Sequence, residues 1–165
     1  MKTKALYWWN YLLGWRFLPR RLQDWLFGTG TRAVELISGL GLLGFALAFA
    51  NHAALLTRYP IYHKFATAPP ALTVSVLAAV GLAQLLLMVW HSPRANILSG
   101  FVLLVGGVLW FLIFAAFSAN YPPFNPSMAL PFILAAVCSL AGKNLIDYSR
   151  LQIRTQERYG KDGSP

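Results

Sequence analysis

Residues 96–117 read NILSGFVLLVGGVLWFLIFAAF and contain no charged residue. About 20 apolar residues in a helix are enough to cross the ~30 Å hydrocarbon core of a bilayer. Three further stretches, at 33–56, 71–90 and 128–142, are similarly apolar, and Glu35 is the one charged residue inside the four. We therefore predict an all-α polytopic membrane protein, with four transmembrane helices in an antiparallel bundle.

The composition excludes an ordinary soluble domain. Of the 165 residues, 57% are hydrophobic and 12% are charged, whereas a soluble domain carries about 25% charged residues. The net charge of +9 is typical of nucleic-acid binding in a soluble protein. Beside membrane spans, the same cations meet anionic lipid headgroups. We therefore expect the partner to be a lipid bilayer with anionic headgroups and not nucleic acid.

The distribution of Lys and Arg predicts an orientation. Six precede the first apolar stretch, one lies between the second and third, and five follow the fourth, against two between the first and second. With four spans, twelve of the fourteen cations share one side of the membrane. Cytoplasmic segments carry the excess of Lys and Arg, so we predict that the N-terminus and the C-terminus are both cytoplasmic.

The segment before the first span is amphipathic. On a helical wheel of residues 5–27, Trp8, Trp15 and Trp25 share a broad apolar face, and most of the charged residues lie elsewhere. Aromatic anchors opposite cations are typical of a helix that lies flat in the headgroup region. We predict an N-terminal amphipathic interfacial helix. It either caps the bundle or inserts, senses lipid or docks a partner, and the sequence leaves both readings open.

The other end of the chain also continues beyond the membrane. The fourth span is expected at 128–146, followed by a cytoplasmic helical extension at 147–158 that carries basic residues, and by a flexible tail at 159–165. No segment is long enough for a separate soluble domain. Residues 1–165 are therefore expected to form a single membrane domain.

Small residues recur at helical spacing inside the spans. Ala71, Ser75, Ala79 and Ala83 are four residues apart and form one ridge. Close approach over small side chains supplies the van der Waals contact that holds helices together in lipid. We expect packing within the bundle, with a homo-oligomer face or a contact with another membrane protein as the alternative. Further small packing positions are Gly44 and Ala48 in the first span and Gly106 and Gly107 in the third.

Two strongly polar residues interrupt the interiors of the spans. Glu35 lies about one turn inside the first span, where the helix dipole favours an acid and where Arg32 is placed to pair with it. This predicts a structural carboxylate that reaches the interface. A proton or cation site is the alternative, because intramembrane carboxylates are often functional. Gln84, near the middle of the second span, is expected to form an interhelical hydrogen bond.

No catalytic or metal-binding pattern is evident. The chain has no HExxH motif, no nucleophile elbow and no Gly-rich phosphate loop. Asn51, His52 and His63 have no Asp, Glu or Cys near them in sequence to complete a metal site. Cys138 lies within the fourth span and is expected to be a packing residue. We predict no enzymatic activity, no metal and no cofactor.

Several short motifs between residue 34 and about 148 carry a resemblance. They are Val34-Glu35-Leu36-Ile37-Ser38-Gly39, Gly81-Leu82-Ala83-Gln84, Arg94 before Ser99-Gly100, Val108-Leu109-Trp110, Phe114 and Phe117. Over these residues the chain resembles a loosely defined group of small four-span proteins encoded by tailed bacteriophages and prophages. The resemblance implies residence in the bacterial inner membrane.

The function expected from these features is non-enzymatic. We predict an accessory, exclusion or immunity-like factor that acts through protein or lipid interactions. One alternative is a holin-like oligomer that permeabilises the inner membrane, although four spans in 165 residues depart from a typical holin. A second alternative is a small ion or solute transporter that uses Glu35 and Gln84.

Overall fold

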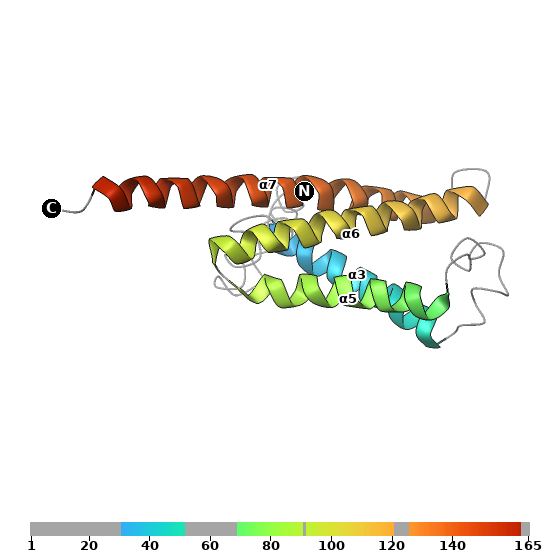
Figure 1. The fold of residues 1–165 in the computed structure, drawn as a ribbon. Helices are drawn as coiled ribbons and strands as arrows, with labels where there is room; N and C mark the ends of the chain where they lie inside the picture. The colour runs from blue at the N-terminus through green and yellow to red at the C-terminus, as the bar shows by residue number, and fades with distance from the viewer. Residues whose placement is uncertain (1–30, 52–68, 91, 121–125, 163–165) are drawn as a thin grey trace, which may run out of the picture.

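A computed structural model of the chain describes residues 31–51, 69–90, 92–120 and 126–162, and within these residues it contains helices and no strand. Each of the four helices is long and apolar enough to cross a membrane. The prediction of an all-helical chain with four potential spans is confirmed. The helices are α3 (Thr31–Asn51), α5 (Pro70–Val89), α6 (Pro93–Asn120) and α7 (Pro126–Asp162) (Figure 1).

The helix boundaries follow local chemistry. Pro70 and Pro93 are the first residues of α5 and α6, and proline is favoured there because the first helical N–H groups have no partner within the helix. Two predicted segments lie outside the described residues. They are the C-terminal end of the first span, at 52–56, and the interfacial segment at 5–27 with Trp8, Trp15 and Trp25.

The longest helix differs most from the prediction. α7 runs without interruption for 37 residues, through the expected boundary at 146 and into the expected tail at 159–165, which is therefore helical as far as Asp162. Between Pro131 and Asp162 the helix contains no further proline, and a glycine such as Gly160 costs only about 1 kcal/mol in a helix. α7 consequently extends well past the other helices (Figure 1).

The four helices form two closely packed pairs. α6 packs most extensively against α7, and α3 against α5. Both pairs cross at glycines: a Cβ added to Gly81 would lie 2.9 Å from the carbonyl oxygen of Gly39, and one added to Gly142 would lie 2.7 Å from that of Gly100. A backbone carbonyl cannot yield as a flexible side chain does, so these crossings require glycine.

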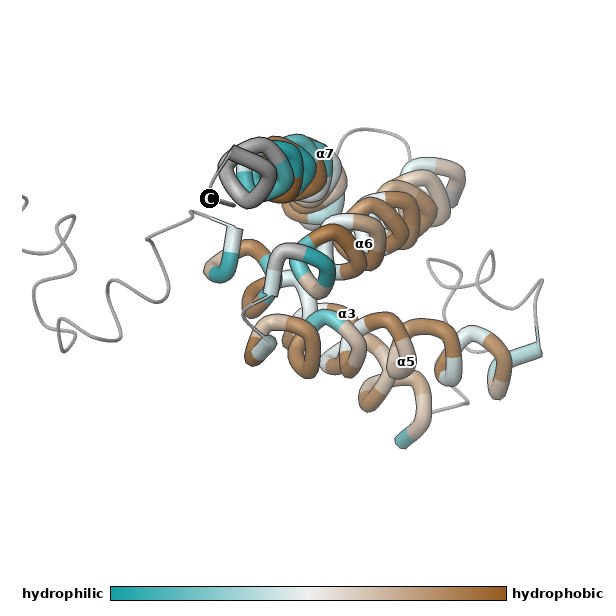
Figure 2. Tube along the Cα trace, turned by 60° about the vertical axis from the view of Figure 1, so that its left-hand side comes forward, coloured by the Kyte–Doolittle hydropathy of each residue, from teal (hydrophilic) through white to brown (hydrophobic). Residues whose placement is uncertain are grey.

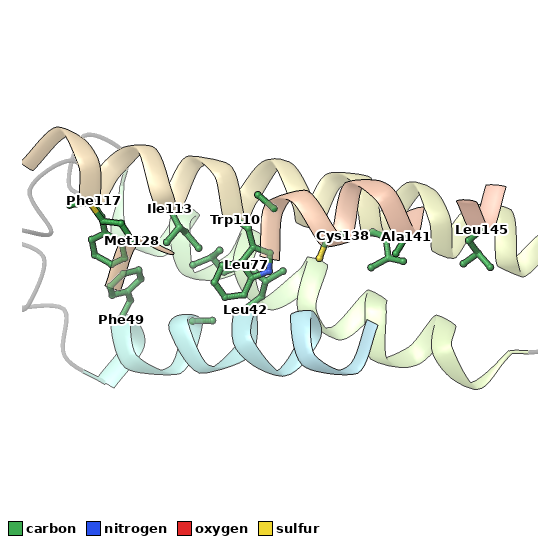
Figure 3. Close-up of a cluster of buried hydrophobic side chains, with 13 residues drawn as sticks. Leu42, Phe49, Leu77, Trp110, Ile113, Phe117, Met128, Cys138, Ala141 and Leu145 are labelled. Carbon is green, nitrogen blue, oxygen red and sulfur yellow. The ribbon is translucent and has the colours of Figure 1, made fainter. Parts of the chain in front are cut away.

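Buried apolar side chains run along the axis between the pairs (Figure 3). Leu42 and Leu103 are fully buried, and Trp110 is 2% exposed. The ring of Phe45 lies 5.7 Å from that of Trp110 in an edge-to-face arrangement, which is a favourable geometry for aromatic pairs. Phe117 and Met128 close one end of this core (Figure 3).

The outward faces are also apolar. Leu47, Leu86 and Leu140 are more than half exposed, and in Figure 2 the hydrophobic colour dominates α5 and α6 while the hydrophilic colour gathers on α7 toward the C-terminal end. A chain with apolar residues both inside and outside is typical of a protein whose solvent is hydrocarbon.

Candidate functional site

Arg32, in the first turn of α3, is the centre of a buried polar cluster. One nitrogen of its guanidinium, Nη1, donates to Glu35 Oε2 at 2.9 Å and to the carbonyl oxygen of Leu87 at 3.4 Å. The other, Nη2, donates to the carbonyl oxygen of Trp90 at 3.2 Å and to Asn96 Oδ1 at 2.9 Å. One side chain thereby joins the start of α3 to the end of α5 and the start of α6.

The guanidinium also satisfies backbone groups. The last carbonyls of a helix have no partner within the helix, and the C-terminus carries partial negative charge. At the end of α5, Arg32 supplies donors and positive charge to the carbonyl oxygens of Leu87 and Trp90. The Leu87 carbonyl oxygen also accepts from the backbone N–H of Trp90 at 3.1 Å. The arginine is 5% exposed, so these bonds form away from bulk water, where each contributes more than it would at a surface.

Glu35 lies one turn further along α3 and is fully buried. Its Oε2 atom accepts from Arg32, and its Oε1 atom accepts a hydrogen bond from the hydroxyl of Ser99 on α6. The expected pair with Arg32 is confirmed, and the carboxylate is fully buried between the helices. The carboxylate is drawn inward because both of its oxygens find donors between α3 and α6.

A second polar contact lies farther along the bundle, at Gln84 of α5. Its Nε2 atom donates to the carbonyl oxygen of Val102 at 3.5 Å, while its buried Oε1 atom has no hydrogen-bond partner among the described residues. A Cβ added to Gly106 would lie 2.1 Å from Nε2. Glycine at 106 therefore makes the space that the amide occupies against α6.

Ser38 makes a third polar contact, on the face of α3 that also carries Glu35. Its hydroxyl oxygen accepts from the indole Nε1 of Trp110 at 3.0 Å, and it would lie 3.5 Å from a Cβ on Gly106. Both Ser38 and Trp110 are buried. The contacts made by Glu35, Ser38 and Gln84 each connect one helix pair to the other.

The chemistry of this region is limited. No group of three His, Cys, Asp or Glu side chains that could hold a metal ion occurs in the part of the chain that the structure describes. Cys138 is fully buried in the core, whereas reactive thiols need an exposed, electropositive site. The arrangement is suited to holding helices together.

The small residues predicted to pack within the bundle are divided by the structure. Gly106 and Gly107 are buried: Gly107 faces Ser139 and the carbonyl oxygen of Ala135. The other predicted positions lie toward the outside of the bundle, because Leu42 and Leu77 occupy the inner faces of α3 and α5. Ala83 is half-buried, and the exposed positions are Gly44, Ala48, Ala71, Ser75 and Ala79.

For those five positions, the expectation of packing within the chain is therefore wrong. The residues that bring the helices together are Gly39, Gly81, Gly100 and Gly142. A usable signal for the first two was present in the sequence. Gly39 is four residues after Glu35 and Gly81 three before Gln84, so each glycine shares a helix face with a polar residue that must turn inward.

Ser99 and Asn96, which complete the cluster around Arg32, were not predicted. They lie more than sixty residues from Arg32 and Glu35. Their role depends on the relative positions of α3 and α6, which no local pattern encodes.

Comparison of the chain with models of known protein families, with curated proteins and with solved structures finds no match. We therefore infer the function from the geometry of the polar contacts and from the exposed helix faces.

Proposed function

We propose that this protein is a non-enzymatic, phage- or prophage-type protein of the bacterial inner membrane that acts through protein or lipid interactions, as an accessory, exclusion or immunity-like factor. Its four spans alternate in direction, both ends are cytoplasmic, and the N-terminal segment lies as an amphipathic helix on the inner leaflet. The distribution of cations described above supports this orientation.

The observation that carries the proposal is that the Glu35 carboxylate is buried and held by two partners. A proton or ion carrier needs a carboxylate that exchanges its partner with solvent or substrate. Glu35 is fully buried, paired with Arg32 and bonded to Ser99. Two opposite charges fixed in this way hold helices together. We therefore assign a structural role to the Arg32–Glu35 pair and expect the function to reside on the outer surface.

The outer surface of α5 supports an interaction role. Ala71, Ser75 and Ala79 follow one another at four-residue spacing on its exposed face, and small residues let a second helix approach closely in lipid. This observation also favours the holin-like alternative, in which many copies assemble into a membrane lesion.

Induced expression of the chain alone in a bacterial host separates these two functions. An accessory or immunity-like factor should accumulate in the membrane without loss of viability and without entry of a membrane-impermeant dye. Dye entry at the same level of membrane protein would overturn the proposal in favour of the holin-like oligomer. Ala79→Leu, which blocks the small-residue face, should then abolish the dye entry.

Transport is tested by purified protein in liposomes. Glu35→Gln should leave any measured proton or ion leak unchanged, because in our proposal the carboxylate carries nothing across the membrane. A flux that wild-type protein supports and Glu35→Gln abolishes, with equal reconstitution and equal helical content, would overturn the structural assignment of Glu35.

A further inference from the structure

A groove runs along the outer seam between α6 and α7. Its volume is about 320 Å³. The buried small residues Gly107 and Ala135 form its floor, and the exposed rings of Phe111 and Phe132 form its walls. The remaining lining residues are Val108, Ala136 and Ser139.

No side chain that lines the groove needs a hydrogen-bond partner from a ligand. Its one polar side chain is Ser139, whose hydroxyl already donates to the carbonyl oxygen of Ala135 at 2.8 Å. Every other lining side chain is apolar. Since apolar surface is buried favourably only against apolar groups, the part of a ligand that fits here is a hydrocarbon chain.

Cations continue the same face of α7 beyond the groove. Lys143 is four residues after Ser139 and seven after Ala136, so the three share one side of the helix. Arg150 follows seven residues later, and both cations are exposed. Asp147 lies between them on this face, which leaves the stretch net positive.

The neighbouring helix contributes a further cation. Arg94 on α6 is exposed and lies fourteen residues before Val108, close to four full turns, which places it on the same flank of α6 as the groove. It also lies at the end of α6 that crosses α7 through Gly100 and Gly142. Positive charge is therefore present on both helices at one end of the groove.

The distance between the charged and apolar parts fits one leaflet. Phe132 and Lys143 are eleven residues apart on α7, which corresponds to about 16 Å along the helix. Half of the ~30 Å hydrocarbon core is about 15 Å. A lipid with its headgroup beside Lys143 has an acyl chain of the right length to reach Phe132.

We propose that the α6–α7 groove is a binding site for an anionic phospholipid of the leaflet from which the α7 extension emerges. One acyl chain occupies the groove, and the phosphate lies beside Lys143 and Arg94. This site rests on the proposed membrane residence and names a lipid partner for it. It does not depend on which protein partner the chain serves.

Native mass spectrometry of the full chain, purified in mild detergent with equal amounts of phosphatidylglycerol and phosphatidylcholine of the same acyl chains, tests the site. We expect one bound phosphatidylglycerol in excess over phosphatidylcholine. Lys143→Gln should reduce that preference about fivefold, since a cation near the surface contributes about 1 kcal/mol to binding anionic lipid. Arg154→Gln, an equal loss of charge three turns farther along α7, should leave the preference unchanged.

Two further variants test the groove itself. Ala136→Trp fills it and should abolish retention of both lipids, while Leu47→Trp, on an exposed face of α3, should not. Phe132→Ala removes one exposed wall of the groove without adding volume, and it should also lose the bound lipid. It serves as the test of the groove if Ala136→Trp does not fold. Equal retention of the two lipids by wild type, or unchanged retention in the groove variants, overturns the site. Carbonate extraction of the same membranes reports separately on membrane residence.

Discussion

Arg32 and Glu35 form a charged pair whose side chains are almost fully buried, and this burial determines how the fold responds to substitution of either residue. Removing one partner of a buried pair leaves the other charge uncompensated and costs about 3–5 kcal/mol, whereas replacing both by apolar residues is often neutral. We expect Glu35→Gln to lower the free energy of unfolding by about 3 kcal/mol. Denaturant titration of the protein in mixed micelles, followed by tryptophan fluorescence, measures this change.

The matched control for Glu35→Gln is the double variant Arg32→Met/Glu35→Leu. It should be more stable than Glu35→Gln, although it loses the bonds to Asn96 and Ser99 as well. If the double variant is the less stable of the two, the cluster stabilises the fold by its hydrogen bonds and not by charge compensation.

Gln84 and Gly106 are expected to be energetically coupled. A methyl group at position 106 meets the Gln84 amide, and overpacking of this kind costs about 1–3 kcal/mol. Gly106→Ala should therefore destabilise the wild type but cost nearly nothing in a Gln84→Ala background. A double-mutant cycle in the same unfolding assay gives the coupling energy. Equal costs in both backgrounds would mean that the amide is not what requires glycine at position 106.

At the scale of the helices, the glycines at the crossings should be far more sensitive to substitution by alanine than the outward-facing glycine. Gly142→Ala places a methyl group 2.7 Å from the carbonyl oxygen of Gly100, so α6 and α7 must separate. We expect a loss of about 1–3 kcal/mol. Gly44→Ala is the control, because a Cβ there meets nothing within 4 Å. It should be neutral or slightly stabilising through helix propensity, and thermal melts of the two variants provide the comparison.

The helices themselves could be predicted from the sequence because hydropathy and length act locally. The face that each helix turns inward could be predicted less well. By size and spacing alone, Ala71, Ser75 and Ala79 look as suitable for close packing as Gly39 or Gly81. What distinguishes the two glycines in the sequence is the helix face that they share with Glu35 or Gln84. The Arg32–Glu35 pair could be predicted because the two residues are one turn apart in the same helix. The contact with Ser99 could not, because it depends on the register between α3 and α6.

On the scale of the whole molecule, the orientation predicts a reporter pattern. An alkaline phosphatase fusion at residue 165 should be inactive and a fusion near residue 62 active, because the enzyme folds only outside the cytoplasm. Green fluorescent protein fusions at the same positions should show the opposite pattern. An active phosphatase at residue 165 would contradict the arrangement with both ends cytoplasmic.

The molecule as a whole is two glycine-crossed pairs connected by polar side chains. Within each pair the backbones approach closely at Gly39 and Gly81 or at Gly100 and Gly142. Between the pairs, Glu35 and Gln84 supply directional contacts. Because lipid offers little hydrophobic drive for helices to associate, these contacts specify how the two pairs meet.

The guanidinium of Arg32 has a consequence for biosynthesis. When α3 leaves the ribosome, Arg32 can already pair with Glu35 inside the same helix, but its other acceptors at Leu87, Trp90 and Asn96 have not yet been translated. A charged side chain with unfilled donors is costly at depth in lipid. We expect the first helix to remain at the insertion machinery or near the headgroups until about residue 96 has been synthesised, so that the spans enter the bilayer together and not one at a time.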